Sequence, residues 1–516
     1  MSASSSSRIK RRGSRPVNIP AVMRMLGIVM ILMGAFMLVP ALVGLGYDEH
    51  HSARACMYAA FTSMGLGAIP AALFHGSTKD EKGRIDFFRR EGLATVGLSW
   101  LVGGVAGALP YLYEGTFTSF VDAFFESVSG LTTTGSTVMS GEGIDSMPHA
   151  IAFWRCFSQW IGGFGIVMVF VVLFPTGGRS LFRSEVPGVS REAGHQRVRD
   201  SALMLVKIYM ALSLLLVTGL LLVGMPSFDA VIHTFSTIAN GGFSNHSESI
   251  AYFGSAAVEG VLVVFMLLSA FNFAIYDTLI RVGPRPAWRR FVGSLEARMF
   301  IGIVVAATLS IAAVLWVWDG PGTPGAEGYG GPVEALRDSL FQVTCIITTA
   351  GFATEDFDSW PQFCRILLML LAFCGACAGS TSGGFKLVRI AIVLKAALVG
   401  VRRFARPRVI HDVRIDGQTL DEGITSSVTG YLVLWVAVFL FATTLVASFG
   451  TDLETSATAV VATLNNVGPG LGSVGPVENF AGLQALPKLV LSFCMVLGRL
   501  EFYALVVLLM PGFWRR

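Results

Sequence analysis

Four short polar segments rich in threonine, asparagine and glycine carry the chemistry that this sequence offers. They surround Gly135, Gly242, Gly351 and Gly468, which are 107, 109 and 117 residues apart. A tail of such residues after a helix can turn its backbone carbonyl oxygens inward, where they replace the water shell of a cation. Because these filter tails (129–137, 238–244, 347–353 and 464–470) contain no ring of acidic side chains, they predict a monovalent rather than a divalent cation.

The predicted ion-binding residues are the glycine of each filter tail and the two residues before it. They are Thr133, Thr134, Gly135, Asn240, Gly241, Gly242, Thr349, Ala350, Gly351, Asn466, Val467 and Gly468. The four tails differ in sequence, since three consecutive threonines occur only in the first and a proline follows the glycine only in the fourth. We expect such an unequal filter to be less stringent than one built from four identical subunits.

Each filter tail follows an apolar segment that we expect to form a pore helix of about three turns. Asp122, Asp229 and Asp338 lie thirteen residues before their glycines, and Thr455 holds that position in the fourth copy. Asp and Thr are favoured N-cap residues, so each pore helix is predicted to begin there. The negative end of the helix then points at the tail and favours a cation.

The composition is that of a membrane protein with many spans. Of 516 residues, 53% are hydrophobic and 14% are charged, against about 25% charged in soluble proteins. A span takes about 20 apolar residues. Ten spans are predicted at 22–43, 56–74, 92–113, 150–174, 202–223, 258–279, 297–318, 363–395, 424–449 and 486–510. Polar, non-helical backbone at membrane depth is tolerated where it lines a water-filled cavity, so the four tails predict a pore.

These segments predict an all-α polytopic membrane protein. It has four non-identical repeats of helix, pore loop and helix around a central pore, a pattern typical of internally repeated chains. The repeats cover 92–175, 201–281, 295–398 and 423–512, after a tail at 1–20 and an accessory transmembrane helix pair at 21–75. Lys and Arg cluster at 8–15, 79–90, 179–199, 281–298, 395–414 and 515–516, which all fall on one side of this arrangement. The positive-inside rule makes that side, and both termini, cytoplasmic.

A second polar segment, residues 375–386, interrupts the last span of the third repeat. Its four glycines should break the helix, because Gly is about 1 kcal/mol less favourable than Ala there. We predict a gating loop beneath the filter, with small-residue helix packing as the alternative. Its gate residues are Gly379, Ser380, Thr381, Ser382, Gly383 and Lys386.

Arg499 is the most conspicuous charge inside a predicted span. An intramembrane Arg costs at least ~2.5 kcal/mol unless it faces water or a partner. Glu501 lies two positions away on another helix face. We therefore expect Arg499 to face the cavity or the gating loop as part of the gate, with plain helix packing as the alternative.

Other charged and sulfur-containing residues allow more than one interpretation. Glu126, inside the first pore helix, either caps a filter amide or is a structural buried acid. Four basic residues near predicted helix ends can snorkel to the interface; these are Arg155, Lys207, Arg365 and Lys488. The seven cysteines show no disulfide framework. Cys374 and Cys377 have CxxC spacing, which we interpret as small-residue packing, with a redox pair as the alternative.

Several of these segments resemble the TrkH family, the membrane subunits of bacterial Trk potassium uptake systems. The resembling residues are 122–135 (DAFFESVSGLTTTG), 153–163, 241–244 (GGFS), 377–384, 466–472 and 498–501. The match covers nearly the whole chain from about residue 22, and the accessory pair favours TrkH over the shorter KtrB relatives. Asn240 and Ala350 depart from the threonines that we expect of the family, which puts the exact selectivity in question rather than the pore.

The resemblance implies potassium uptake through the filter across the bacterial inner membrane, with potassium bound at the filter residues. It also implies a homodimer, an arginine at position 499 that supports the gating loop, and a cytosolic TrkA-like nucleotide-binding ring. Membrane lipid is the other expected partner; neither a nucleic-acid partner nor a nucleotide site in this chain is expected.

Three other functions compete with potassium uptake. A sodium-permeable or sodium- or proton-coupled transporter of the same superfamily is the main alternative, and the sequence does not separate channel from symporter. A membrane enzyme would need a coherent set of catalytic or metal-binding side chains, whereas the eight histidines are scattered. Four filter tails argue against a non-conducting sensor or scaffold.

Overall fold

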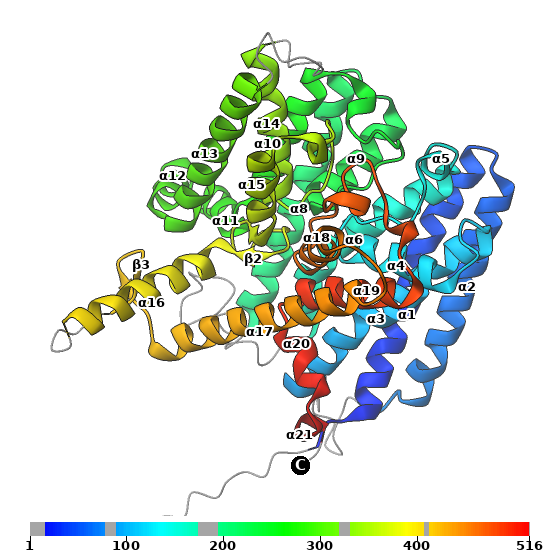
Figure 1. The fold of residues 1–516 in the computed structure, drawn as a ribbon. Helices are drawn as coiled ribbons and strands as arrows, with labels where there is room; N and C mark the ends of the chain where they lie inside the picture. The colour runs from blue at the N-terminus through cyan, green and yellow to red at the C-terminus, as the bar shows by residue number, and fades with distance from the viewer. Residues whose placement is uncertain (1–15, 78–88, 174–194, 319–330, 407–411, 515–516) are drawn as a thin grey trace, which may run out of the picture.

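The computed structural model describes residues 16–77, 89–173, 195–318, 331–406 and 412–514, and this part of the chain is almost entirely helical (Figure 1). Extended pairing within it is limited to β1 (Cys374–Gly375) with β2 (Phe385–Lys386) and β3 (Arg414–Ile415) with β4 (Gln418–Thr419). Short helices include α5 (Gly141–Asp145), α12 (Pro284–Gly293) and α21 (Pro511–Trp514), with 3-10 turns at Ala251–Phe253, Phe357–Ser359, Gly472–Val474, Phe480–Gly482 and Val507–Leu509. The all-α fold expected from the sequence is confirmed.

Helices α1 (Ile19–Gly46) and α2 (His50–Leu73) form the expected accessory pair at the periphery of the molecule (Figure 1). They cross at backbone contact: a Cβ atom built on Gly27 would lie 2.5 Å from the Gly67 carbonyl oxygen, and the reverse distance is the same. Small residues at such crossings let membrane helices approach closely. The pair packs on α3 and α6 and so encloses one side of the first repeat.

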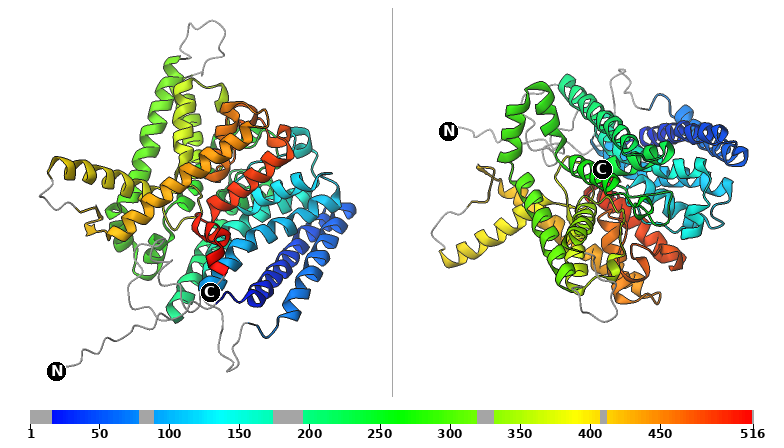
Figure 2. Two further views of the ribbon diagram at one scale, coloured as in Figure 1. Left: turned by 60° about the horizontal axis from the view of Figure 1, so that its bottom comes forward. Right: turned by 90° about the horizontal axis from the view of Figure 1, so that it is seen from above.

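Four stretches of chain each contain a long helix, a pore helix, a filter tail and a further helix, placed around a common centre when seen from above (Figure 2). The long helices are α3 (Arg89–Glu114), α8 (His195–Leu222), α13 (Leu295–Trp318) and α17 (Glu422–Ala447). The pore helices are α4 (Phe120–Leu131), α9 (Ser227–Ala239), α14 (Pro332–Ile347) and α18 (Leu453–Leu464). The further helices are α6 (His149–Leu173), α10 (Ala256–Ala270) with α11 (Phe273–Arg281), α15 (Gln362–Phe373) with α16 (Leu387–Ala405), and α19 (Ala485–Arg499) with α20 (Tyr503–Val506).

The described residues contain six single helices long and apolar enough to cross a membrane, or up to eight spans if two bent pairs are included. The single helices are α1, α2, α3, α8, α13 and α17. The other two of the ten expected spans are α6 and the interrupted pair of α15 and α16. The interruption at 374–386 falls where the glycine count predicts it.

Two of the expected spans are not continuous helices, contrary to the prediction. The span at 258–279 bends by 87° between α10 and α11. Asn272 caps α11 by accepting a hydrogen bond from the backbone N–H of Ala274 (2.8 Å), and the N–H of Phe273 donates to the Gly379 carbonyl (3.0 Å). The break between α10 and α11 thus contacts the gating loop.

The predicted span at 486–510 bends by 113° after α19. Glu501 and Phe502 have φ of 52° and 61°, a left-handed conformation that ends the helix. Glu501 turns toward α16 and pairs with Arg389. Arg499 therefore lies at the end of a helix and not in the middle of one, and Glu501 is not its partner, as expected.

The predicted N-caps of the pore helices are wrong by about one turn or more. Asp122 and Asp229 lie within the first turns of α4 and α9, and Asp338 lies further inside α14, which begins at Pro332. Thr455 lies in the first turn of α18, whose N-cap is Asp452. The N-caps are Ser119 in α4, Pro226 in α9, Gly331 in α14 and Asp452 in α18. The thirteen-residue spacing therefore selected the wrong position even in α4 and α18, where a favoured capping residue lies three positions upstream.

The orientation across the membrane stays a prediction. Many of the basic residues on which it depends lie outside the described residues or have side chains that are not described. They are those of 1–15, most of those at 79–90 and 179–199, Arg408, Arg515 and Arg516.

Candidate functional site

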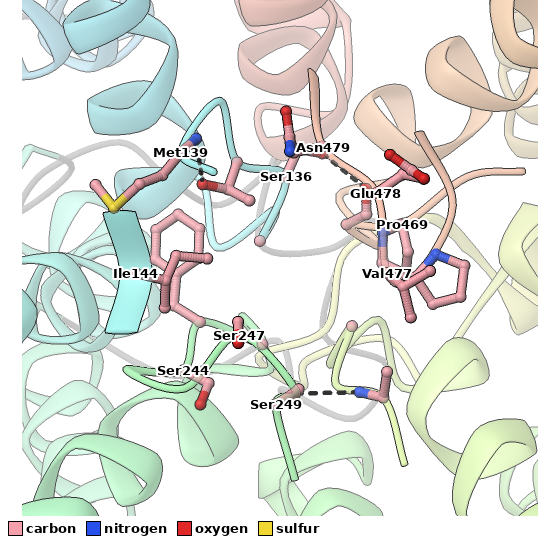
Figure 3. Close-up of a pocket in the computed structure, with 18 of the residues that line it drawn as sticks. Ser136, Met139, Ile144, Ser244, Ser247, Ser249, Pro469, Val477, Glu478 and Asn479 are labelled. Atoms are coloured by element: carbon pink, nitrogen blue, oxygen red, sulfur yellow. Dashed lines mark hydrogen bonds between the residues drawn. The ribbon is translucent and has the colours of Figure 1, made fainter. Parts of the chain in front are cut away.

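The four filter tails meet at one cavity of about 120 Å³. Its lining includes all four predicted filter glycines, Gly135, Gly242, Gly351 and Gly468. In Figure 3, Ser136, Ser244 and Pro469 lie around a common opening and come from three different repeats. Segments more than a hundred residues apart in sequence are thus brought to one place, as the repeat predicts.

The four tails share one backbone conformation. The residue two positions before each glycine is left-handed, with φ of 55° at Thr133, 54° at Asn240, 60° at Thr349 and 56° at Asn466. The glycines follow with φ of 87°, 77°, 75° and 109° in chain order. Left-handed threonine is uncommon and strained, and such strain tends to occur at functional sites.

The glycines and carbonyls of neighbouring repeats form a closed ring. A Cβ atom built on each glycine would meet the carbonyl oxygen of the residue before the next repeat's glycine. For Gly135, Gly242, Gly351 and Gly468 in turn, it would lie 2.2, 2.1, 2.3 and 2.9 Å from the oxygens of Gly241, Ala350, Val467 and Thr134. The contacts run from the first repeat through the fourth and back to the first. Only glycine at these four positions leaves room for the carbonyl oxygens of the neighbouring repeats.

The helices of two repeats support the tails at backbone contact. A Cβ atom on Gly162 of α6 would lie 1.8 Å from the carbonyl oxygen of Leu131, the last residue of α4. Gly498 of α19 has the same relation to Leu464 at the end of α18, at 2.1 Å. Every pore helix ends within the first three residues of its filter tail, so the negative ends of four helix dipoles adjoin the tails.

The gating loop contacts the first residues of the filter tails, whereas the cavity borders their last residues. The Asn240 side chain donates to the hydroxyls of Thr381 (2.9 Å) and Ser382 (3.2 Å). The N–H of Gly383 donates to the Thr349 hydroxyl (2.9 Å). The loop is thereby bound to the second and third filter tails, and Asn240 faces it rather than the cavity.

Arg499 lies against the gating loop, where the sequence predicts it. Its guanidinium donates to the carbonyl oxygen of Thr381 at 2.9 Å and to that of Gly162 at 3.4 Å. Lys386 donates to the Ser382 carbonyl within the loop, and the Ser380 hydroxyl donates to the Cys377 carbonyl (2.6 Å). Hydrogen bonds thus hold each predicted gate residue within the loop or to its surroundings, and Gly379 is joined to α11.

Two basic residues expected to snorkel are buried ion-pair partners instead, which corrects the prediction. Arg155 is 2% exposed and its Nε lies 2.7 Å from Glu126, whose side chain is fully buried. Lys488 is 6% exposed and pairs with Asp122 at 2.6 Å. Both acidic partners lie on the first pore helix, α4, and the position of a basic residue at a helix end does not reveal them.

The two remaining basic residues differ from each other. Arg365 is paired with Asp358 at 2.7 Å and with Glu454 at 2.5 Å. Lys207 is exposed, as snorkelling requires.

The open question about Glu126 is resolved by its contacts. It accepts a hydrogen bond from the N–H of Val138, just after the first filter tail, at 3.0 Å. It also accepts from the Thr137 hydroxyl (3.0 Å) while paired with Arg155. Glu126 therefore caps an amide and is a buried acid at the same time.

Gln159 is one of the side chains that hold a filter tail and that sequence reasoning missed. Gln159 of α6 donates to the Gly241 carbonyl (2.6 Å) and accepts from the N–H of Phe243 (3.2 Å). It lies four residues after Arg155, on the same face of α6. The sequence offered one signal of this role: Arg155 and Gln159 are polar residues four positions apart within a predicted span of the first repeat.

The cysteines are free, and two of them hold the gating loop in place. All seven lie within the described residues and none forms a disulfide. Cys374 belongs to β1, where it pairs with Phe385, and the N–H of Cys377 donates to the Ala270 carbonyl (3.3 Å). These contacts fit the packing interpretation of the CxxC spacing.

Comparison with known proteins places these features in context. The family model for TrkH, described as a cation transport protein, matches residues 60–514. The chain is similar to the Trk system potassium uptake protein TrkH of Salmonella typhimurium, with 37% identity over 500 residues that cover 96% of this chain and 99% of that one. It is 31% identical to the Trk system potassium uptake protein TrkG of Escherichia coli over 507 residues, with the same coverage of 96% and 99%.

A solved structure has the same fold. The crystal structure of the potassium transporter TrkH from Vibrio parahaemolyticus matches with a TM-score of 0.85 and 35% sequence identity. The match covers 96% of this chain and 100% of that chain. The similarity therefore extends over the accessory pair and all four repeats.

Proposed function

Because this chain belongs to the TrkH family of cation transport proteins, we propose that it takes up potassium ions across the bacterial inner membrane. The observation that carries the proposal is the closed ring in which four glycines pack against the carbonyl oxygens of Thr134, Gly241, Ala350 and Val467. Such carbonyls can replace the hydration shell of a monovalent cation. The chain is not an enzyme, since the family consists of transporters.

The proposed path of the ion follows from the arrangement of the tails. A hydrated ion enters the cavity at the glycines and loses water as it meets the carbonyls. Four helix C-termini stabilise its charge. An inward potential supplies about 2.3 kcal/mol per charge per 100 mV. The proposed potassium ligands are the filter residues Thr133, Thr134, Gly135, Asn240, Gly241, Gly242, Thr349, Ala350, Gly351, Asn466, Val467 and Gly468.

We propose that the gating loop closes the path beneath the filter. Its hydrogen bonds to Asn240, Thr349 and Arg499 support a closed arrangement, because they tie the loop to two filter tails at once. Opening of the path then requires the loop to break these hydrogen bonds together. The similar proteins are named as parts of a Trk system, which supports a complex with further components. The components that we propose are a cytosolic TrkA-like ring that moves the loop and a second copy of this chain in a homodimer.

The proposed domain division keeps the boundaries expected from sequence. The repeats are 92–175, 201–281, 295–398 and 423–512, with the accessory pair at 21–75 and both termini in the cytoplasm. The four filter tails of the structure each fall within one of these ranges, which supports the division.

Flux measurements on purified protein in liposomes test the proposal. We expect uptake of potassium and rubidium in preference to sodium, and loss of that preference in Gly135→Ser, whose Cβ would lie 2.2 Å from the Gly241 carbonyl oxygen. Comparable sodium flux in the wild type would favour the sodium-permeable alternative. An imposed proton gradient that drives potassium uphill would favour a coupled transporter over a channel. Unchanged flux and preference in the variant would refute the filter assignment.

A further inference from the structure

The pore helices carry a different side chain at one equivalent position, nine residues before each filter glycine. The residues there are Glu126, His233, Gln342 and Ala459. Glu126 and His233 each reach the last residue of their own filter tail, and Gln342 reaches the residue that follows its tail. Glu126 accepts from the Thr137 hydroxyl at 3.0 Å, the His233 ring contacts the Ser244 hydroxyl at 3.0 Å, and the Gln342 amide donates to the Thr354 hydroxyl at 3.3 Å. One position in the repeat thus anchors three of the four tails.

The anchor of the first repeat differs because it is charged and reaches a second tail. Arg155 donates from Nε to Glu126 (2.7 Å) and from Nη1 to the carbonyl oxygen of Ser244 (2.6 Å). Its guanidinium carbon also lies 3.8 Å from the centre of the Phe243 ring. The pair therefore joins the end of the first filter tail to the end of the second.

A neutral anchor is sufficient to hold a single tail, as His233 and Gln342 demonstrate in the second and third repeats. Burying two charges is costly and is stable only while they remain paired. The need to hold the tail in a stable fold therefore does not explain why Glu126 and Arg155 form an ion pair. A planar guanidinium with donors at fixed angles can instead bind a carboxylate and a carbonyl together, which fixes the distance between them.

The pair acts close to the ring of carbonyls. Thr137 and Ser244 each lie two residues beyond their filter glycine, Gly135 and Gly242. The first glycine packs against the Gly241 carbonyl. The ends of the two tails are therefore only two residues from the contact between Gly135 and the Gly241 carbonyl. A change in the separation of these ends should alter that contact.

We propose that the Glu126–Arg155 ion pair is a specificity-determining clamp: it sets the separation of the first and second filter tails and thereby the preference for potassium over the smaller sodium ion. This inference rests on the proposed potassium filter. Glu126 and Arg155 are positioning residues, since they act on the ion through the backbone of the tails. The clamp contacts only the first and second filter tails, and Ala459 leaves the fourth tail without an anchor at the equivalent position.

The test compares the wild type with Glu126→Gln and Arg155→Lys in liposomes. Glu126→Gln keeps the shape and removes the charge, whereas Arg155→Lys keeps the charge but cannot bind the carboxylate and the carbonyl in the same planar geometry. Arg337→Gln is the matched control, because Arg337 forms a bidentate ion pair with Glu259 between α14 and α10. The readouts are the reversal potential between potassium and sodium and the thermal stability in detergent.

We expect both clamp variants to fold and conduct, with the potassium-to-sodium permeability ratio reduced about tenfold, equivalent to about 1.4 kcal/mol. The control should keep the wild-type ratio. An unchanged ratio in folded clamp variants would overturn the inference while leaving the filter intact. Failure of both variants to fold would also overturn it, because the pair would then serve the stability of the whole chain. A wild type without potassium preference would refute the proposed function itself.

Discussion

Replacement of Gly242 by alanine tests the ring of carbonyls with a control from the same repeat. Gly224, at the end of α8, is equally left-handed, with φ of 90° against 77° at Gly242. Nothing lies within 4 Å of a Cβ atom built on Gly224, whereas one on Gly242 would lie 2.1 Å from the Ala350 carbonyl oxygen. The two substitutions therefore share the backbone strain and differ in the contact between repeats.

The magnitudes follow from that difference. A left-handed L-residue costs roughly 1–2 kcal/mol, which both variants incur. Overpacking adds about 1–3 kcal/mol, and only Gly242→Ala incurs it, because the second and third tails must separate to admit the methyl group. We expect Gly242→Ala to lower the thermal stability further than Gly224→Ala and to reduce the potassium preference at least tenfold, about 1.4 kcal/mol.

The assay measures thermal unfolding in detergent together with potassium and sodium flux in liposomes for the two variants and the wild type. Gly224→Ala should keep the wild-type ion preference despite its lower stability. If both variants lose the same stability and retain the same preference, the contact between Gly242 and the Ala350 carbonyl has no role in selection, and the reasoning from the ring fails.

The remaining predictions concern the gate and one pore-helix cap. Arg499→Gln should raise basal potassium flux about tenfold or more, because hydrogen bonds to a charged group contribute about 1.5–3 kcal/mol to the closed loop; unchanged flux would contradict the assigned gate contact. Asn240→Ala should raise flux by a smaller factor, since it removes neutral hydrogen bonds to the loop. Hydrogen bonds from Thr455 hold the pKa of Asp452 below its usual value of 3.8, so its stabilising effect is present at neutral pH and lost as the pH falls through that lowered pKa. Asp452→Ala should therefore lower stability by about 1 kcal/mol at pH 7 and by less at pH 3, measured by thermal unfolding.

The sequence predicted those features that depend on short-range pattern. Repeated glycines after apolar segments identified the four tails, and the glycine-rich run at 375–386 identified the break between α15 and α16. The position of Arg499 against that break followed from the cost of a buried charge. Each of these inferences used residues whose neighbours in sequence already constrain them.

Features that depend on partners distant in sequence were not predictable in the same way. Residues 500–502 contain neither glycine nor proline, and the bend there follows the pairing of Glu501 with Arg389. The burial of Arg155 depends on Glu126 of another helix, so proximity to a helix end suggested solvent instead. The pore helices begin upstream of the expected caps, at Asp452 in α18 for example, because a shared spacing to the filter glycine does not by itself identify the capping side chain.

Direct observation of the bound ion is the measurement closest to the central claim. A crystal grown with rubidium or thallium, examined by anomalous scattering, should contain a peak on the axis between the carbonyl oxygens of Thr134, Gly241, Ala350 and Val467. Absence of a peak there, with ordered ions elsewhere in the chain, would contradict the account.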